Sequence, residues 1–240
     1  MNDKPPLRKE RVEAREEAIL NAAHSVFSEH GFKGARMAEI AERAEVAEGT
    51  LYLYFRNKDA LLGGVIGRFY ADLTASALSG VQQYDDTVKR LRFLGTHHME
   101  QCLAEWRILE LMVGQYRELA EYEDRGYAAL NRTYVAVFDS VIGEAIARGE
   151  IRSDISLSVL RDMFYGTLEY VCRTSMLHEG PRKPAQAVDE LIRIFQTGVL
   201  QAVSNAEKTT PLTAVARRLE RVASRMEASL SADTRTGRKT

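Results

Sequence analysis

The sequence predicts an all-α fold with a small N-terminal three-helix head and a larger C-terminal helical domain. Apolar side chains recur at three- and four-residue spacing along most of the chain, and no stretch shows the sustained alternation of a half-buried strand. The prolines lie near the ends or between expected helices, at Pro5, Pro6, Pro181, Pro184 and Pro211. Helix interiors are therefore free of the residue that most strongly breaks them.

The head is expected to contain short helices ended and capped by specific residues. Residues 11–30 carry Ile19, Val26 and Phe27 at helical spacing, and Gly31 follows as the left-handed residue that ends many helices. Residues 37–44 and 48–55 are expected to form two short helices joined by a tight turn. Asn57 can then cap the next helix, 58–79, by accepting a hydrogen bond from its first turn.

The larger domain is expected to consist of long helices separated by loops at residues 148–154 and 180–184. The expected helices cover residues 85–103, 105–117, 119–148, 155–179, 184–205 and 211–230. Two of them, 119–148 and 155–179, are apolar on more than one face, so we expect each to be buried on two sides.

Charge is distributed unevenly, although the net charge of the 240 residues is only −1. Residues 1–15 carry five basic and three acidic side chains, and residues 206–240 carry eight basic and four acidic ones. Basic ends on a more acidic body suit a protein that touches phosphate groups with one part only.

No segment is typical of a membrane-bound or secreted protein. No apolar run approaches the roughly 18 residues of a membrane span, and the opening MNDKPPLRKER lacks the apolar core of a secretory signal. Cys102 and Cys172 belong to no CxxC motif, which favours two buried, reduced thiols. We therefore expect a cytoplasmic protein with no membrane partner.

The segment 34–59, GARMAEIAERAEVAEGTLYLYFRNKD, carries the strongest functional pattern. Gly49 allows close approach to a phosphate backbone, and Thr50 offers both a hydroxyl and a methyl group. Tyr52 and Tyr54 are long and rigid, with hydroxyls that can reach phosphates. The segment therefore predicts a helix-turn-helix whose second helix enters the major groove of DNA.

The same segment resembles the DNA-binding signature of the TetR family of bacterial repressors. The resemblance runs from about residue 13 to residue 71, and it rests on Gly31-Phe32, Ile40-Ala41, Gly49-Thr50-Leu51-Tyr52, Tyr54-Phe55 and Lys58 in one register. It implies a DNA-binding head followed by an all-helical domain that binds a ligand and dimerises. Carried over position by position, it implies DNA contacts from Arg36, Ala38, Glu48, Gly49, Thr50, Tyr52, Tyr54 and Lys58.

The resemblance, together with the composition of the two ends, divides the chain into five expected segments. They are a flexible N-terminal arm (1–12), the DNA-binding head (13–73, with its motif at 36–55), the ligand-binding and dimerisation domain (74–205), an extension helix (206–230) and a disordered tail (231–240). The extension is amphipathic, so it can pack on its own domain, cover the dimer or place its arginines near DNA.

Two positions depart from the family pattern. Glu45 stands where the family usually has glycine, so either Glu45 adopts a left-handed conformation or the turn bends differently. Ala47 stands where the family tends to have a serine cap, which loses about 1 kcal/mol of capping. Because Glu45 and Glu48 also place negative charge near the expected phosphates, we expect modest or salt-sensitive affinity for DNA.

Aromatic and methionine side chains are dense between residues 85 and 179, more so than a small core requires, which favours an apolar ligand pocket. Plain core packing is the alternative for each of these residues. The expected lining residues are Phe93, Trp106, Met112, Tyr116, Tyr134, Phe138 and Phe164. Segments 115–151 and 164–169 resemble family members that regulate fatty-acid degradation, which implies an acyl-CoA effector. Basic residues available for its phosphates are Arg92, Arg107, Arg117 and Arg132.

A palindromic operator requires a twofold-symmetric homodimer. Helices 155–179 and 184–205 are expected to form the dimer interface. Their apolar residues are Leu157, Leu160, Phe164, Leu168, Val171, Leu191, Ile194, Phe195, Val199 and Leu200. Some of these must face the protomer's own core, and the sequence leaves the division open.

Two other functions compete with this reading. An enzyme would need a catalytic constellation, and the sequence has no GxSxG, HExxH or glycine-rich phosphate loop, so we expect neither catalysis nor a cofactor. His98 and Cys102 share one helix face, but no third ligand stands at helical spacing, so we expect no metal site. An adaptor that dimerises without binding DNA is the second rival, and specific operator binding would separate the two.

Overall fold

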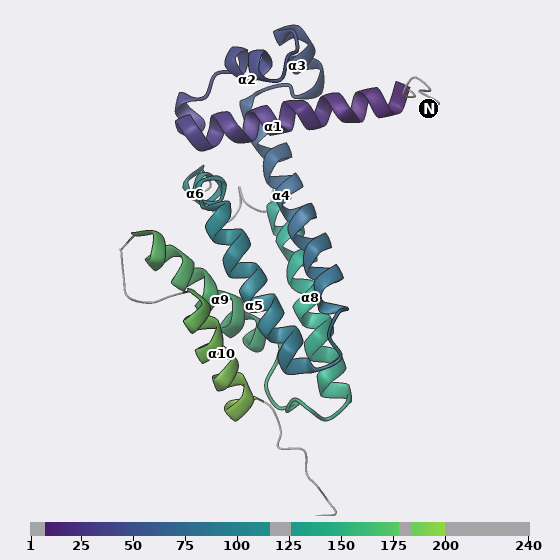
Figure 1. Ribbon diagram of the computed structural model, residues 1–240, viewed down its shortest axis with the longest axis vertical. Coiled ribbons are helices and arrows are strands. Elements are labelled where there is room, and N and C mark those ends of the chain that lie inside the picture. Colours follow the sequence, from purple (N-terminus) through teal and green to yellow (C-terminus); the bar gives the residue numbers. More distant parts are fainter. Residues whose placement is uncertain (1–7, 116–125, 178–183, 200–240) are drawn as a thin grey trace, which may run out of the picture. The chain divides into compact units, whose positions relative to one another are not determined.

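The structure, a computed structural model, describes residues 8–115, 126–177 and 184–199. In these ranges the chain contains nine helices, which confirms the all-α fold (Figure 1). The expected extension helix 206–230 and tail 231–240 lie outside the described residues. None of the described helices has the length and apolar character that crossing a membrane would require.

The head begins with α1 (Arg8–Gly34), α2 (Met37–Arg43) and α3 (Glu48–Tyr54). Gly31 takes the expected left-handed φ of 67°, but it interrupts α1 rather than ending it, because helical structure resumes as far as Gly34. At its other end α1 begins at Arg8, inside the segment expected to be a flexible arm. Residues 8–12 are mostly good helix formers, and Lys9 forms an i,i+4 ion pair with Glu13, with Nζ 3.7 Å from Oε1.

The core of the head is formed by one apolar side from each helix. Phe27 of α1, Ile40 of α2 and Leu51 of α3 are almost completely buried, together with Leu61 of α4 (Lys58–Val81). Asn57 caps α4 as expected, because its side-chain oxygen accepts a hydrogen bond of 2.8 Å from the backbone N–H of Ala60. α4 therefore starts inside the head.

The body surrounds α5 (Thr87–Ala104), which packs on α4, α8 (Tyr127–Ala147), α9 (Leu157–Leu177) and α10 (Pro184–Gly198). α4 continues from the head and lies side by side with α8, as Figure 1 shows. α6 (Trp106–Gln115) contacts α1, α4 and α5. One long helix and one short helix therefore connect the head with the body.

Most residues expected at the dimer interface are instead buried inside the protomer. Those buried are Leu160, Phe164, Leu168, Val171, Leu191, Phe195 and Val199, while Leu157 packs partly buried on the core and Leu200 lies outside the described residues. α9 packs on α5, α8 and α10, and α10 packs on α5 and α9, so the buried sides of these two helices face the protomer's own helices. Among the described members of this set only Ile194 is exposed, and the side chains of Val159, Met163, Tyr170 and Met176 on these two helices are exposed as well.

Two polar contacts hold α1 against the helices of the body. His24 Nε2 lies 2.6 Å from Glu105 Oε2, at the junction of α5 and α6. Arg68 on α4 donates a hydrogen bond of 2.7 Å to the side-chain oxygen of Asn21 on α1. The orientation of α1 is thus fixed by side chains as well as by apolar packing.

Candidate nucleic-acid interface

The short helix α3 presents one face to solvent because its opposite face is buried. Leu51 and Phe55 stand four residues apart and both enter the core of the head. On a helix of 3.6 residues per turn, residue 53 must then point away from that core. Leu53 and Tyr52 are indeed 85% and 46% exposed, and Gly49 is exposed one turn earlier.

The four residues of α3 that the sequence singled out, Gly49, Thr50, Tyr52 and Tyr54, lie on two different sides of the helix. Gly49 and Tyr52 lie on the outer face with Leu53. Thr50 and Tyr54, four residues apart, are only partly exposed, and Tyr54 packs against the buried core. Sequence reasoning missed Leu53, which could have been found from its place midway between two buried residues.

The remaining expected contact residues surround α3. Arg36 occupies the N-cap position of α2, and its side chain reaches into solvent with Nη2 3.8 Å from Glu39 Oε2. Ala38 is exposed in the first turn of α2, and Glu48 is exposed as the first residue of α3. These three residues are accessible to a nucleic acid.

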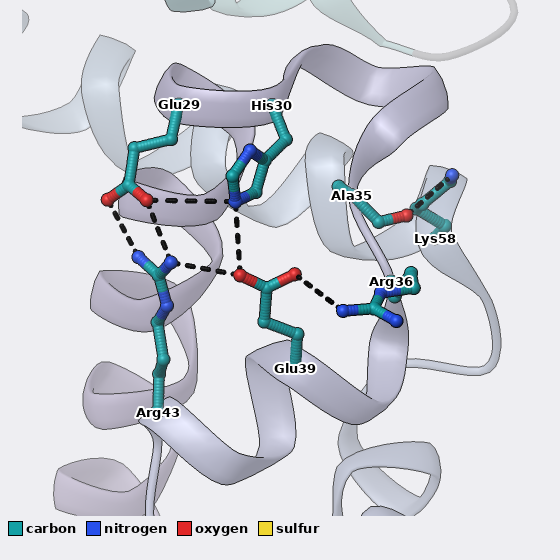
Figure 2. A network of polar contacts seen from close by, with 7 residues as sticks. All are labelled: Glu29, His30, Ala35, Arg36, Glu39, Arg43 and Lys58. Carbon is teal, nitrogen blue, oxygen red and sulfur yellow. Dashed lines mark hydrogen bonds and ion pairs between the residues drawn. The ribbon is translucent and has the colours of Figure 1, made fainter.

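Lys58, expected to hold a phosphate, is engaged by the backbone in this structure. Its ammonium donates a hydrogen bond of 2.9 Å to the carbonyl oxygen of Ala35, as Figure 2 shows, and lies 3.5 Å from that of Lys33. It also lies 4.7 Å from the centre of the Phe32 ring. Lys58 therefore ties the connection between α1 and α2 to the start of α4, and a phosphate would share its three donors.

A network of charged side chains fixes α2 on α1 (Figure 2). Arg43 donates two hydrogen bonds of 2.7 Å to the carboxylate of Glu29 and one of 2.9 Å to Glu39. His30 Nε2 lies 3.1 Å from the same oxygen of Glu39. The bond from Arg43 holds the pKa of Glu29 below its usual value. Such exposed pairs contribute little stability singly, but the bidentate geometry sets the orientation of α2, on which α3 is built.

The turn between α2 and α3 contains both departures from the family pattern. Glu45 has a φ of 54°, so of the two expected alternatives it adopts the left-handed conformation. Ala47 is the N-cap residue of α3 and supplies no side-chain hydrogen bond to the first turn. The turn is therefore strained and uncapped, each at a cost of about 1 kcal/mol.

Three of the seven expected ligand-binding residues meet in one aromatic cluster in the body. Tyr134, Phe138 and Phe164 are almost fully buried around Tyr165, and the ring centres of Phe138 and Phe164 are 4.8 Å apart. The Tyr134 hydroxyl lies 3.1 Å from Nδ1 of His98. Burial lowers the pKa of His98 to about 3, so its imidazole is neutral at physiological pH.

The other four expected ligand-binding residues lie apart from this cluster or outside the described residues. Phe93 packs against Gly80, Tyr84 and His97 between α4 and α5. Trp106 is partly buried and Met112 is buried, both on α6. Tyr116 lies outside the described residues.

The basic residues expected near an effector differ in their surroundings. Arg92 is paired with Asp189, and Arg107 Nη1 lies 3.5 Å from Glu110 Oε2. Arg132 is exposed on α8, and Arg117 lies outside the described residues. Within the described ranges, no three His, Cys, Asp or Glu side chains gather as a metal site would require.

Comparison with known proteins identifies the family. The pattern of the bacterial regulatory proteins of the tetR family matches residues 19–65, which contain the helix-turn-helix. The pattern of the C-terminal region of the YsiA-like protein matches residues 75–195, half of the chain. The chain belongs to the TetR family. It is therefore a transcriptional regulator with an N-terminal helix-turn-helix.

The similar TetR-family proteins include regulators of fatty-acid metabolism. The fatty acid metabolism regulator protein of Bacillus subtilis is 20% identical over 181 residues, 75% of this chain and 93% of that protein. The transcriptional repressor KstR of Mycobacterium tuberculosis is 29% identical over 144 residues, 58% of this chain and 62% of KstR. These relatives are transcriptional regulators rather than enzymes.

Solved structures show the same fold. FadR, the fatty acid degradation regulator of Bacillus halodurans, has a TM-score of 0.65 at 25% identity, over 81% of this chain and 98% of FadR. FadR of Bacillus subtilis in complex with stearoyl-CoA has a TM-score of 0.66 at 21% identity, over 76% of this chain and 98% of that one.

Proposed function

We propose that this TetR-family chain acts in the cytoplasm as a homodimeric repressor that binds a palindromic operator and is released by a long-chain acyl-CoA. The observation that carries the DNA-binding part is the exposed outer face of α3, presented by a head whose other side is buried. Such a short exposed helix fits the major groove, which admits one α-helix.

The operator contacts that we propose surround this face. They are Arg36, Ala38, Glu48, Gly49, Thr50, Tyr52, Tyr54 and Lys58. Arg36 is well placed for a phosphate because its side chain is exposed and, among the described residues, its guanidinium has one distant ion pair, with Glu39 at 3.8 Å. The acidic side chain of Glu48 would oppose nearby phosphates and make the affinity depend on the other contacts.

Dimerisation through α9 and α10 is supported by the apolar residues that the protomer leaves exposed. Val159, Met163 and Tyr170 occur at spacings of four and seven residues along α9, so they share one face. Ile194 adds an exposed apolar side chain on α10. Exposed apolar side chains that share one face of a helix favour an interface, and a second copy of the chain would cover them.

An acyl-CoA effector is supported by the relatives named for fatty-acid regulation and by the aromatic cluster of the body. The acyl chain would need to separate packed rings such as Phe138 and Phe164, whose centres are 4.8 Å apart. Such binding favours a second arrangement of α5, α8 and α9 and so shifts the population away from the state described here. The contact between His24 and Glu105 would carry that shift to α1.

The DNA-binding proposal is tested with Thr50→Ala and Tyr54→Ala in the full-length protein. An operator is first selected from random duplexes, and dissociation constants are measured at fixed salt concentration. Each substitution is expected to weaken specific binding while circular dichroism stays unchanged. Thr133→Ala, an exposed position on α8, is the matched control and should bind normally. Enrichment of no sequence would support the adaptor instead.

The effector proposal is tested by titrating the protein–operator complex with dodecanoyl-CoA and stearoyl-CoA at constant salt. Free coenzyme A and free stearate serve as controls for the two halves of the molecule. Release by the acyl-CoAs alone supports the proposal. Operator binding that is unchanged at saturating acyl-CoA would exclude this ligand class without affecting the DNA-binding proposal.

A further inference from the structure

Leu53 is the most exposed large hydrophobic side chain in the described part of the chain, at 85%. It stands at the centre of the outer face of α3, next to Tyr52 and opposite the buried Leu51. Single exposed leucines are common on protein surfaces and need no explanation by themselves. The position of this one, on the face that enters the groove in the proposed function, makes it a candidate for reading DNA.

The composition of α3 leaves few ways to read bases. Its seven residues, EGTLYLY, include no Arg or Lys to pair with guanine and no Asn or Gln to pair with adenine. Glu48 can accept from a base amino group, usually that of cytosine, and Thr50 is partly withdrawn from solvent. The remaining strong signal in the major groove is the methyl group of thymine, which is read by apolar contact.

Gly49 places Leu53 close to the bases. The two residues are four apart, so they lie on the same face of α3. A Cβ built on Gly49 would meet no atom within 4 Å, so packing inside the protein does not require a glycine there. Close approach of α3 to the floor or wall of the groove supplies the reason, because a glycine removes the side chain that would hold the helix away.

We propose that Leu53 contacts a thymine methyl group in each operator half-site and so selects a T·A pair at that position. This inference rests on the proposed function, since it assumes that α3 lies in the major groove. Removing one buried methyl group should weaken binding about fourfold, given the usual value of burying a methyl-sized group. Removing the methyl group in both half-sites should weaken binding about fifteenfold.

The experiment uses the selected operator and replaces thymines by uracil, which deletes only the 5-methyl group. Symmetric replacements are made one position at a time, and each duplex is titrated with the full-length protein and with Leu53→Ala. At one position we expect the uracil replacement to lower the affinity of the native protein about fifteenfold and that of Leu53→Ala less than twofold. Leu78→Ala, which truncates an exposed leucine on α4, is the matched control. Its affinity should fall on uracil replacement by the same factor as that of the native protein.

The outcomes separate the two proposals. If uracil replacement affects the native protein and Leu53→Ala equally at every thymine of the selected operator, this inference is overturned and the DNA-binding function stays intact. Weaker binding of Leu53→Ala by the same factor on every duplex would also overturn it, because a general effect on the head has no base preference. Failure to select any operator would count against the proposed function itself.

Discussion

Replacing Gly80 by alanine should expose how tightly α4 and α5 are packed. A Cβ at this position would lie 1.8 Å from Cζ of Phe93 and 2.3 Å from its Cε1, so the ring must move. Gly67, on the same helix, is the matched control because its Cβ would meet nothing within 4 Å. Both substitutions gain about 1 kcal/mol of helix propensity.

Overpacking at Gly80 opposes that gain by about 1–3 kcal/mol. Gly67→Ala should therefore raise the free energy of unfolding by about 1 kcal/mol, and Gly80→Ala should lower it by about 0–2 kcal/mol. Urea unfolding at one protein concentration measures both, because the stability of a dimer depends on concentration. Equal stabilisation by the two alanines would refute the packing described for Phe93.

A double-mutant cycle with Phe93→Leu identifies the cause. If Gly80→Ala acts through the ring, its cost should fall when the ring is absent, with a coupling of about 0.5–3 kcal/mol. Additive effects would place the strain elsewhere. Coupling would also assign Phe93 to the contact between α4 and α5, in place of the effector pocket that the sequence led us to expect.

Three further predictions concern the turn of the head and the buried histidine. Glu45→Gly should raise the free energy of unfolding by up to about 1 kcal/mol by relieving the left-handed φ, and urea unfolding showing a loss would contradict the strain argument. Ala47→Ser should raise the free energy of unfolding by about 1 kcal/mol, because the serine hydroxyl can cap α3, and urea unfolding again measures it. No gain in the free energy of unfolding would mean that the new hydroxyl does not bond to the N–H groups of the first turn. For His98, whose pKa of about 3 in the folded protein is below the unfolded value of about 6.5, the unfolded state binds more protons between these limits. The contribution of His98 to the free energy of unfolding is thus fully present above pH 6.5 and is lost as the pH falls, by about 2 kcal/mol at pH 5. His98→Gln should remove this pH-dependent loss. Identical pH profiles of the native protein and the variant in urea unfolding would contradict a buried neutral imidazole.

Local features of the head were predictable because they depend on neighbouring residues alone. The left-handed Gly31 and the cap at Asn57 each follow from the chemistry of one residue in a short stretch. At Glu45 the sequence left a choice between a left-handed residue and a differently bent turn, and the structure decides it. The burial of Leu51 on one side of α3 follows from helical spacing. These rules need no knowledge of distant parts of the chain.

Features that join distant segments could not be predicted in the same way. Phe93 and Phe138 are the same residue type on long helices, and only the packing of α4, α5, α8 and α9 places one beside Gly80 and the other in the aromatic cluster. The sequence left open how the apolar residues of α9 divide between core and surface, and in the structure Phe164 packs beside Gly95 of α5 while Met163 is exposed. The bidentate bond from Arg43 to Glu29 crosses from α2 to α1, and of that network only the i,i+4 pair with Glu39 has a sequence signal.

Because α4 is long, a small tilt at one of its ends displaces the other end by several ångströms. Its 24 residues form one helix of about 36 Å that begins beside the α1–α2 connection, at Lys58, and runs along α8 in the body. A tilt of about 5° at the body end would carry the other end through about 3 Å, by simple leverage over that length. In the dimer that we propose, two protomers tilting in opposite directions would change the separation of their α3 helices by about 6 Å, against the roughly 34 Å between successive major grooves on one side of DNA. A rearrangement too small to disturb the core would then be enough to take both heads out of register with the proposed operator.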